Sequence, residues 1–274
     1  MSAQPGIRGK AWFKALTGSE RALDGDPGSL LTADAKLGED RARFLCVVPN
    51  PDARFPCARK GEVGLEEAYA LAHRIREVIA LDTSERKRPI VAIVDAKSQA
   101  YGRREETAAI FLAAATAAAA YAAARMQGHP TVTLVVGQAI SGGFLMHGYQ
   151  ASRILAFNDH DVVIHAMHKE AAARITLRSV EEVERLGREI IPMSYDIHDY
   201  ARLGLLHKLL QVQEPDNPSS RTVAQVQKEL IDAVADARTG TTDLSSRRSS
   251  DGAHQARRAG LLARAHMERE WNEP

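Results

Sequence analysis

The chain has few cysteines, few aromatic residues and almost no net charge. Of its 274 residues, two are cysteine and 5% are aromatic, and the formal net charge is +1. Cys46 and Cys57 do not have the spacing of metal ligands, and so few cysteines are typical of a protein in the reducing cytosol. The near-neutral charge argues against a general nucleic-acid-binding protein, which carries a basic excess on one face.

Several kinds of segment are also missing. No run is apolar enough to cross a bilayer, and residues 1–6 lack the apolar core of a secretion signal. No Gly-rich phosphate loop precedes a Lys-Ser or Lys-Thr pair, which disfavours nucleotide hydrolysis. No Met-Lys-Met turn is present, so the chain is not itself a biotin carrier. We expect a cytoplasmic protein that binds neither nucleic acid nor membrane.

The middle of the chain alternates strands and helices. Apolar runs predict strands over 43–48, 89–95, 131–136, 153–157 and 162–164, and helical spacing predicts helices over 65–79 and 105–126. The second helix has alanine almost throughout its middle, which favours close packing. This order predicts an α/β fold with a parallel sheet and helices on its faces. A site then belongs at the carboxyl ends of the strands, where Asp95 and Gly137 fall.

The character of the chain changes after residue 164. Helical patterns cover 180–188, 195–203, 222–237 and 253–271, and the Ser- and Arg-rich segment 243–251 is expected to be an exposed loop. We predict a catalytic α/β domain over residues 1–213. Residues 214–274 are predicted to form a helical extension that packs on this domain or on a partner subunit.

The segment Gly-Gln-Ala-Ile-Ser-Gly-Gly-Phe-Leu-Met-His-Gly-Tyr, residues 137–149, carries most of the functional information. It predicts a glycine turn at the end of a strand and then a helix, whose first N–H groups have no intrahelical partner. Such donors suit the oxygen of an enolate or a tetrahedral intermediate. Gly142 and Gly143 would let a substrate carbonyl approach the main chain. The alternative is that the two glycines only allow close packing of helix and strand.

Three histidines, His160, His165 and His168, lie close together in the sequence. The pair His165-x-x-His168 has a spacing seen in metal sites, but no third ligand is evident, so we predict no metal.

Two motifs carry a resemblance to a known family. Residues 94–102 (Val-Asp-Ala-Lys-Ser-Gln-Ala-Tyr-Gly), with Glu105 and Glu106 after them, and residues 137–143 resemble the crotonase-fold carboxyltransferases. In that family an Asp-x-x-Gly-x-x-x-Gly loop precedes an Ala-rich helix, a strand and a Gly-Gly turn. Ser98 stands where the first loop glycine would be. The resemblance implies the ClpP/crotonase-like fold, a ββα spiral, here with a helical C-terminal extension.

A closer resemblance runs along the whole chain. Residues 8–13, 54–56, 61–65, 192–197, 200–204 and 243–247 are similar to the gamma subunits of biotin-independent malonate decarboxylase. That family implies a subunit that forms a shared active site with a crotonase-like beta subunit. The pair would decarboxylate a malonyl thioester to an acetyl thioester and CO2, on an acyl-carrier protein with a coenzyme-A-like arm. An alpha subunit would recharge the carrier, and no cofactor would be bound covalently to this chain.

The chemistry of that reaction defines the residues to look for. Loss of CO2 leaves an enolate, which fixed N–H donors stabilise, and the carbanion then needs a proton. Neither a metal nor a covalent nucleophile is required. We expect Gly142 and Gly143 to supply main-chain donors to the enolate or, if the partner subunit supplies those donors, to hold the departing carboxylate. The candidate proton donors are Ser141, Tyr101, His147 and His165, and the candidate contacts to the carrier arm are Gly137, Gln138, Ala139, Lys97 and Gly102. For each side chain a purely structural role is the alternative.

Two other functions remain open at this stage. Residues 137–143 also resemble the nucleophile turn of Clp-type serine peptidases, with Ser141 as nucleophile and His165 as base. The third, acidic member would be Asp196 or Asp199, although neither matches that family's context. In the other alternative the chain is a non-catalytic scaffold subunit that completes its partner's site.

Overall fold

A single sheet forms the centre of the molecule. The computed structural model describes residues 6–272, so residues 1–5, where the sequence shows no secretion signal, lie outside the described part. Within this range the sheet has seven strands in the order β1-β2-β3-β4-β5-β7, and β6 pairs with β4. The strands are β1 (Leu30–Leu37), β2 (Asp40–Val47), β3 (Ile90–Ala96), β4 (Thr131–Ile140), β5 (Arg153–Phe157), β6 (Val163–His165) and β7 (Lys208–Leu210).

The sheet is parallel except at one edge. β1 and β2 form an antiparallel hairpin, and all other neighbouring strands run parallel. Every residue of β3 is buried, as expected for a strand covered on both faces. The predicted parallel α/β arrangement is therefore confirmed, and the carboxyl ends of β3 and β4 meet at the same edge of the sheet.

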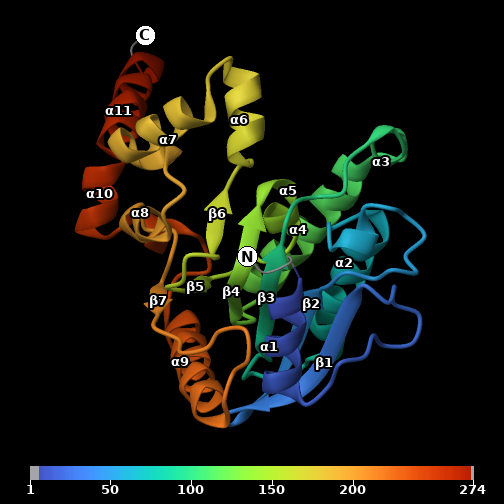
Figure 1. Ribbon diagram of the computed structural model, residues 1–274. Helices are drawn as coiled ribbons and strands as arrows, with labels where there is room; N and C mark the ends of the chain where they lie inside the picture. Colours follow the sequence, from blue (N-terminus) through green and yellow to red (C-terminus); the bar gives the residue numbers. More distant parts are fainter. Residues whose placement is uncertain (1–5, 273–274) are drawn as a thin grey trace.

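Helices cover both faces of the sheet (Figure 1). α1 contacts α9 and the sheet, and α2 and α4 pack against each other. The helices are α1 (Ile7–Thr17), α2 (Leu65–Leu81), α3 (Arg103–Thr107), α4 (Ile110–Met126), α5 (Ser141–Met146), α6 (Lys169–Thr176), α7 (Val180–Glu189), α8 (Ile197–Arg202), α9 (Ser220–Thr239), α10 (Asp251–Ala256) and α11 (Arg258–Asn272). Short 3-10 turns cover Ala58–Lys60, Ile191–Met193 and Ser245–Arg248.

The Ala-rich segment is an ordered, packed helix. Ala113, Ala117, Ala120 and Ala124 recur at helical spacing and are buried, so α4 presents a smooth face to its neighbours. The predicted helix over 105–126 is nevertheless two helices, because the chain turns at Ala109, whose φ is 60°. The predicted helix over 253–271 also divides, at Arg257 between α10 and α11, and the Nε of Arg257 donates to the carbonyl of Leu203.

The largest correction concerns the strand before the glycine pair. The prediction ended this strand at residue 136 and placed a turn at Gly137, but β4 continues to Ile140. β6 supplies the reason, since Val163 to His165 pair in parallel with Gln138 to Ile140. Four helices and strands have no counterpart among the predicted elements, namely α1, β1, α6 and β7.

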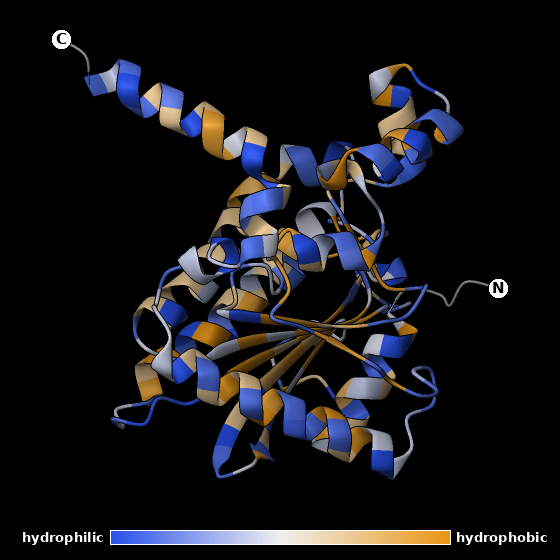
Figure 2. Ribbon diagram, turned by 90° about the vertical axis from the view of Figure 1, so that its left-hand side faces the viewer, coloured by the Kyte–Doolittle hydropathy of each residue, from blue (hydrophilic) through white to orange (hydrophobic). Residues whose placement is uncertain are grey.

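The first and last helices of the C-terminal region, α9 and α11, differ in how far they are buried. α9 buries Val226, Leu230, Ala233 and Val234 in the main core. α11 buries no residue and projects from the body of the molecule (Figure 2). A domain boundary near residue 213 stays a prediction. Across the described residues, no helix is both long and apolar enough to span a bilayer.

Candidate functional site

Asp95 fixes the geometry of the sheet at the carboxyl end of β3. Its carboxylate accepts hydrogen bonds from the amides of Gly6 (2.8 Å), Gly9 (3.1 Å) and Gln138 (3.1 Å). Burial raises the pKa of Asp95, and these hydrogen bonds oppose the shift. A Cβ at Gly137 would lie 2.2 Å from Asp95 Oδ1, so only glycine fits there. Asp95 and Gly137 therefore shape the register shift between β3 and β4.

The turn into α5 falls at Ser141. Its φ of 58° lies in the left-handed region, which is uncommon for a residue other than glycine. Directly after it, Gly142 N donates a hydrogen bond to Gln99 Oε1 at 2.8 Å. Gly143 packs on the same loop, where a Cβ would lie 2.5 Å from the carbonyl oxygen of Ser98. The two glycines thus differ, because Gly143 serves close packing and Gly142 presents an amide beside a pocket.

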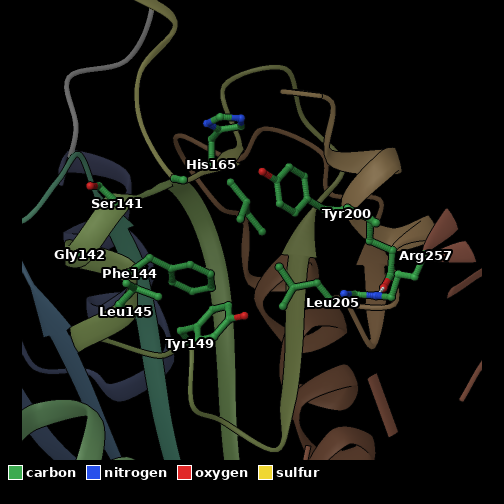
Figure 3. Close-up of a pocket in the computed structure, with 12 residues that line it drawn as sticks. Ser141, Gly142, Phe144, Leu145, Tyr149, His165, Tyr200, Leu205 and Arg257 are labelled. Atoms are coloured by element: carbon green, nitrogen blue, oxygen red, sulfur yellow. Dashed lines mark hydrogen bonds between the residues drawn. The ribbon is translucent and has the colours of Figure 1, made fainter. Parts of the chain in front are cut away.

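The pocket has a volume of about 320 Å³. Its walls are mainly apolar and aromatic, and Figure 3 shows the rings of Phe144, Tyr149 and Tyr200 around it. The lining residues are Ser141, Gly142, Phe144, Leu145, Tyr149, Ile164, His165, Ala166, Tyr200, Leu203, Leu205 and Arg257. The structure therefore brings three predicted site residues, Ser141, Gly142 and His165, to one cavity.

His165 lies at the end of β6 and is held by its surroundings. Its ring stacks on Tyr195 with centroids 3.8 Å apart, and Nδ1 lies 2.8 Å from the carbonyl oxygen of Met167. Burial lowers the pKa of His165, while hydrogen bonds to the backbone of Met167 and Met193 oppose the shift. At neutral pH the imidazole is therefore expected to be uncharged.

The arrangement of a serine peptidase is not formed. Within residues 6–272 no hydrogen bond joins Ser141 to His165, and the Nδ1 of His165 faces a carbonyl rather than a carboxylate. The two acidic candidates are engaged elsewhere: Asp196 pairs with the neighbouring His198 at 2.8 Å and Asp199 with Arg202 at 3.0 Å.

Two candidate proton donors lie away from the pocket lining. Tyr101 is 60% exposed. His147 is fully buried, its Nε2–H donates to Ile93 O at 3.0 Å, and its Nδ1 accepts from the Tyr121 hydroxyl at 2.9 Å. Burial lowers the pKa of His147 to about 4. The neutral ring of His147 holds α5 against β3 and α4, away from the pocket, and its role as a proton donor stays a prediction.

The predicted contacts to a carrier arm are not gathered in the pocket. Gly137 and Ala139 are buried in β4, and Gln138 N is bound to Asp95. The carbonyl of Lys97 accepts from His168 Nε2 at 3.2 Å, and the carbonyl of Gly102 accepts from Glu106 N at 2.9 Å. A role of these five residues in binding the arm stays a prediction.

Two pocket residues, and one residue hydrogen-bonded to the pocket-lining Gly142, were not identified from the sequence. Gln99 belongs to the quoted loop, but nothing in its spacing indicates a contact with Gly142. Tyr200 and Arg257 come from α8 and from the junction of α10 and α11, far along the chain. Burial raises the pKa of the Tyr200 hydroxyl, so this group stays protonated at neutral pH. Only their place in the fold reveals these residues.

One group of potential metal ligands lies outside the pocket. Asp159, His160 and Asp161 hold ligand atoms within 4.8 Å of one another. The Arg8 guanidinium, however, lies 2.8 Å from Asp159 and 3.5 Å from Asp161, so a cation already balances these carboxylates. The group is therefore best explained as an ion-pair network that ties α1 to this loop.

The fold is that of a carboxyltransferase. The structure superimposes on transcarboxylase 12S with a TM-score of 0.63 at 16% identity, over 85% of this chain and 42% of that one. This likeness shows the fold alone, and it confirms the predicted crotonase-type α/β class. The fold therefore places the chain in the crotonase class of α/β proteins, with the part-buried Gly142 close to an apolar pocket.

The chain belongs to the family of malonate decarboxylase gamma subunits, whose sequence profile matches residues 58–267. The structure superimposes on a Pseudomonas malonate decarboxylase hetero-tetramer in complex with coenzyme A with a TM-score of 0.89 and 50% identity, covering 94% of this chain and 99% of that one. For the Pseudomonas MdcD-MdcE hetero-dimer the TM-score is 0.87 and the identity 48%, covering 96% and 99%. The malonyl-S-ACP:biotin-protein carboxyltransferase MADD of Malonomonas rubra is 32% identical over 243 residues, 83% of this chain and 80% of that one.

Proposed function

We propose that this chain and a homologous beta subunit form a shared site that decarboxylates a malonyl thioester. The substrate is carried by a small acyl-carrier protein with a coenzyme-A-like arm, and the products are CO2 and an acetyl thioester. An alpha subunit recharges the carrier, and the complex works in the cytoplasm. The relatives support this proposal: one was solved as a hetero-dimer, one as a hetero-tetramer with coenzyme A, and one acts on malonyl-S-ACP.

The observation that carries the proposal is the main-chain amide of Gly142, a residue that lines an apolar pocket. Loss of CO2 moves the electron pair of the broken C–C bond into an enolate, whose charge gathers on the thioester oxygen. A fixed N–H donor stabilises this charge more than the neutral carbonyl of the ground state. One such donor contributes on the order of 3 kcal/mol.

The apolar walls serve the carboxylate side of the same reaction. Phe144, Tyr149 and Leu205 leave little polar surface to solvate a carboxylate, whereas CO2 is uncharged and apolar. We assign this pocket to the departing CO2 or to the adjacent part of the acyl group. The proton that quenches the carbanion then comes from the side of the pocket formed by Ser141 and His165, because Tyr101 and His147 lie away from it.

Co-expression with the beta subunit tests the shared site. We expect CO2 release from malonyl-CoA, used as a mimic of the loaded carrier, by the purified pair and by neither subunit alone. The rate should be unchanged by avidin, because no biotin acceptor takes part. Release by one subunit alone would refute a shared site, and inhibition by avidin would show that the carboxyl group passes to biotin.

A second assay addresses the peptidase alternative. A fluorophosphonate labels only an activated serine, and Ser141 lacks a hydrogen-bonded base within the described structure. We expect no labelling of the chain alone or in the complex. Labelling that is lost in Ser141→Ala would favour a serine hydrolase.

A further inference from the structure

The amide on which the proposed function depends is covered by a single side chain. Gln99 Oε1 accepts from Gly142 N at 2.8 Å, and Ser98 Oγ lies 3.3 Å from the same oxygen. The oxygen of a carboxamide is an uncharged carbonyl acceptor, as is the oxygen of a thioester. Gln99 Oε1 therefore stands where a thioester oxygen would have to lie in order to use this donor.

The backbone beneath Gln99 is fixed on both sides. Val63 N donates to Ser98 O at 3.0 Å, and Ala100 N donates to Val63 O at 2.8 Å. Gly143 also packs directly on the carbonyl of Ser98. The loop therefore cannot withdraw without breaking these contacts.

The side chain of Gln99, in contrast, is partly exposed, and its amide oxygen is held by two hydrogen bonds, from Gly142 N and Ser98 Oγ. Exposed side chains change rotamer within picoseconds to nanoseconds. Rotation about the side-chain bonds alone would uncover Gly142 N while the loop and α5 stay in place.

We propose that Gln99 is a placeholder, whose amide oxygen occupies the position of the thioester oxygen until a substrate displaces it. This inference rests on the proposed function. The placeholder keeps the Gly142 amide paired while the site is empty, as a shielded N–H requires. It also competes with the substrate, and the net strength of an internal hydrogen bond corresponds to about a two- to tenfold reduction in apparent affinity.

Two substitutions of opposite effect test the placeholder in the assembled complex. Gln99→Ala removes the competitor, so KM for malonyl-CoA and Kd for acetyl-CoA should fall about two- to tenfold without a decrease in kcat. Gln99→Glu gives a charge-assisted and stronger hydrogen bond, so both constants should rise. The exposed Gln127, at the end of α4, provides the matched control, and Gln127→Ala should change neither constant.

Hydrogen exchange gives a readout that does not depend on activity. Without ligand, the amides of residues 140–144 should exchange faster in Gln99→Ala than in the wild type, because Gly142 N has lost its hydrogen-bond acceptor. A lower kcat with unchanged KM in Gln99→Ala would overturn the proposal, because Gln99 would then position α5. Unchanged constants and unchanged exchange would also overturn it.

The failure of the placeholder and the failure of the proposed function are distinguishable. If Gly142→Asp abolishes decarboxylation while Gln99→Ala changes nothing, only the placeholder is refuted. If Gly142→Asp stays active, the proposed function of this amide is refuted, and the placeholder with it, even where Gln99→Ala speeds exchange.

Discussion

Alanine substitution at the two adjacent glycines should have unequal effects on stability. At Gly143 a Cβ would lie 2.5 Å from Ser98 O and 2.6 Å from Ser98 C, both backbone atoms that the pairing with Val63 holds in place. Overpacking of this kind costs about 1–3 kcal/mol. At Gly142 the nearest atoms, at 3.0 Å, belong to the end of the Gln99 side chain, which is able to move aside. Alanine also favours a helix over glycine by about 1 kcal/mol, so Gly142→Ala should be near neutral.

Urea denaturation measures this difference directly. The buried Trp12 provides a fluorescence signal for loss of the core. After the helix preference is subtracted, Gly143→Ala should lower the free energy of unfolding by up to about 2 kcal/mol, and Gly142→Ala should change it by less than about 0.5 kcal/mol. Equal stability of the two variants would refute the claim that Gly143 is required for packing on the Ser98 carbonyl.

Two further predictions concern buried polar groups. Burial lowers the pKa of His147 to about 4, so the stability that its neutral form contributes is complete above pH 6.5 and is lost as the pH falls towards 4. Thermal melts should show a loss of about 3 kcal/mol between pH 6.5 and pH 4, and His147→Gln should not show this loss. An identical dependence of stability on pH in the variant would contradict this prediction. Arg8 donates hydrogen bonds to Val136 O, Asp159 and Asp216, so Arg8→Met should destabilise the chain by about 2 kcal/mol. Lys10→Met, on the exposed side of α1, should not destabilise it. Equal melting temperatures of the two variants would contradict this prediction.

The sequence predicted those parts of the fold that depend on local patterns. The apolar runs identified β3 and β5, and the spacing of Leu65, Ala68, Ala72 and Ile75 identified α2. The antiparallel edge strand β1 was missed because it mixes Asp34 and Lys36 with apolar residues, as edge strands do.

Features that depend on distant pairing could not be predicted in this way. β4 extends past Gly137 because β6, which begins at Val163, pairs with it, and because Ala96 of β3 pairs with Ala139. The bond between Gly142 N and Gln99 joins residues 43 positions apart. The helical position of His147 did not reveal that its ring faces Ile93 and Tyr121, because both partners come from other elements.

The candidate site was therefore predicted only in part. The segment 137–149 pointed to the correct end of the sheet, and Ser141, Gly142 and His165 line one pocket. The aromatic walls could not be predicted, since Tyr200 becomes a neighbour of Phe144 only through the docking of α8 beside β6.

The rate of CO2 release by the assembled complex carrying Gly142→Asp is the most direct test of the central claim. A carboxylate at this position would repel the enolate and displace the acceptor from the Gly142 amide. We expect an intact complex by size-exclusion chromatography and at least about a hundredfold loss of rate, because removal of one oxyanion donor has an effect of that size. An intact complex with undiminished CO2 release would contradict it, and would show that this chain only supports a site supplied by its partner.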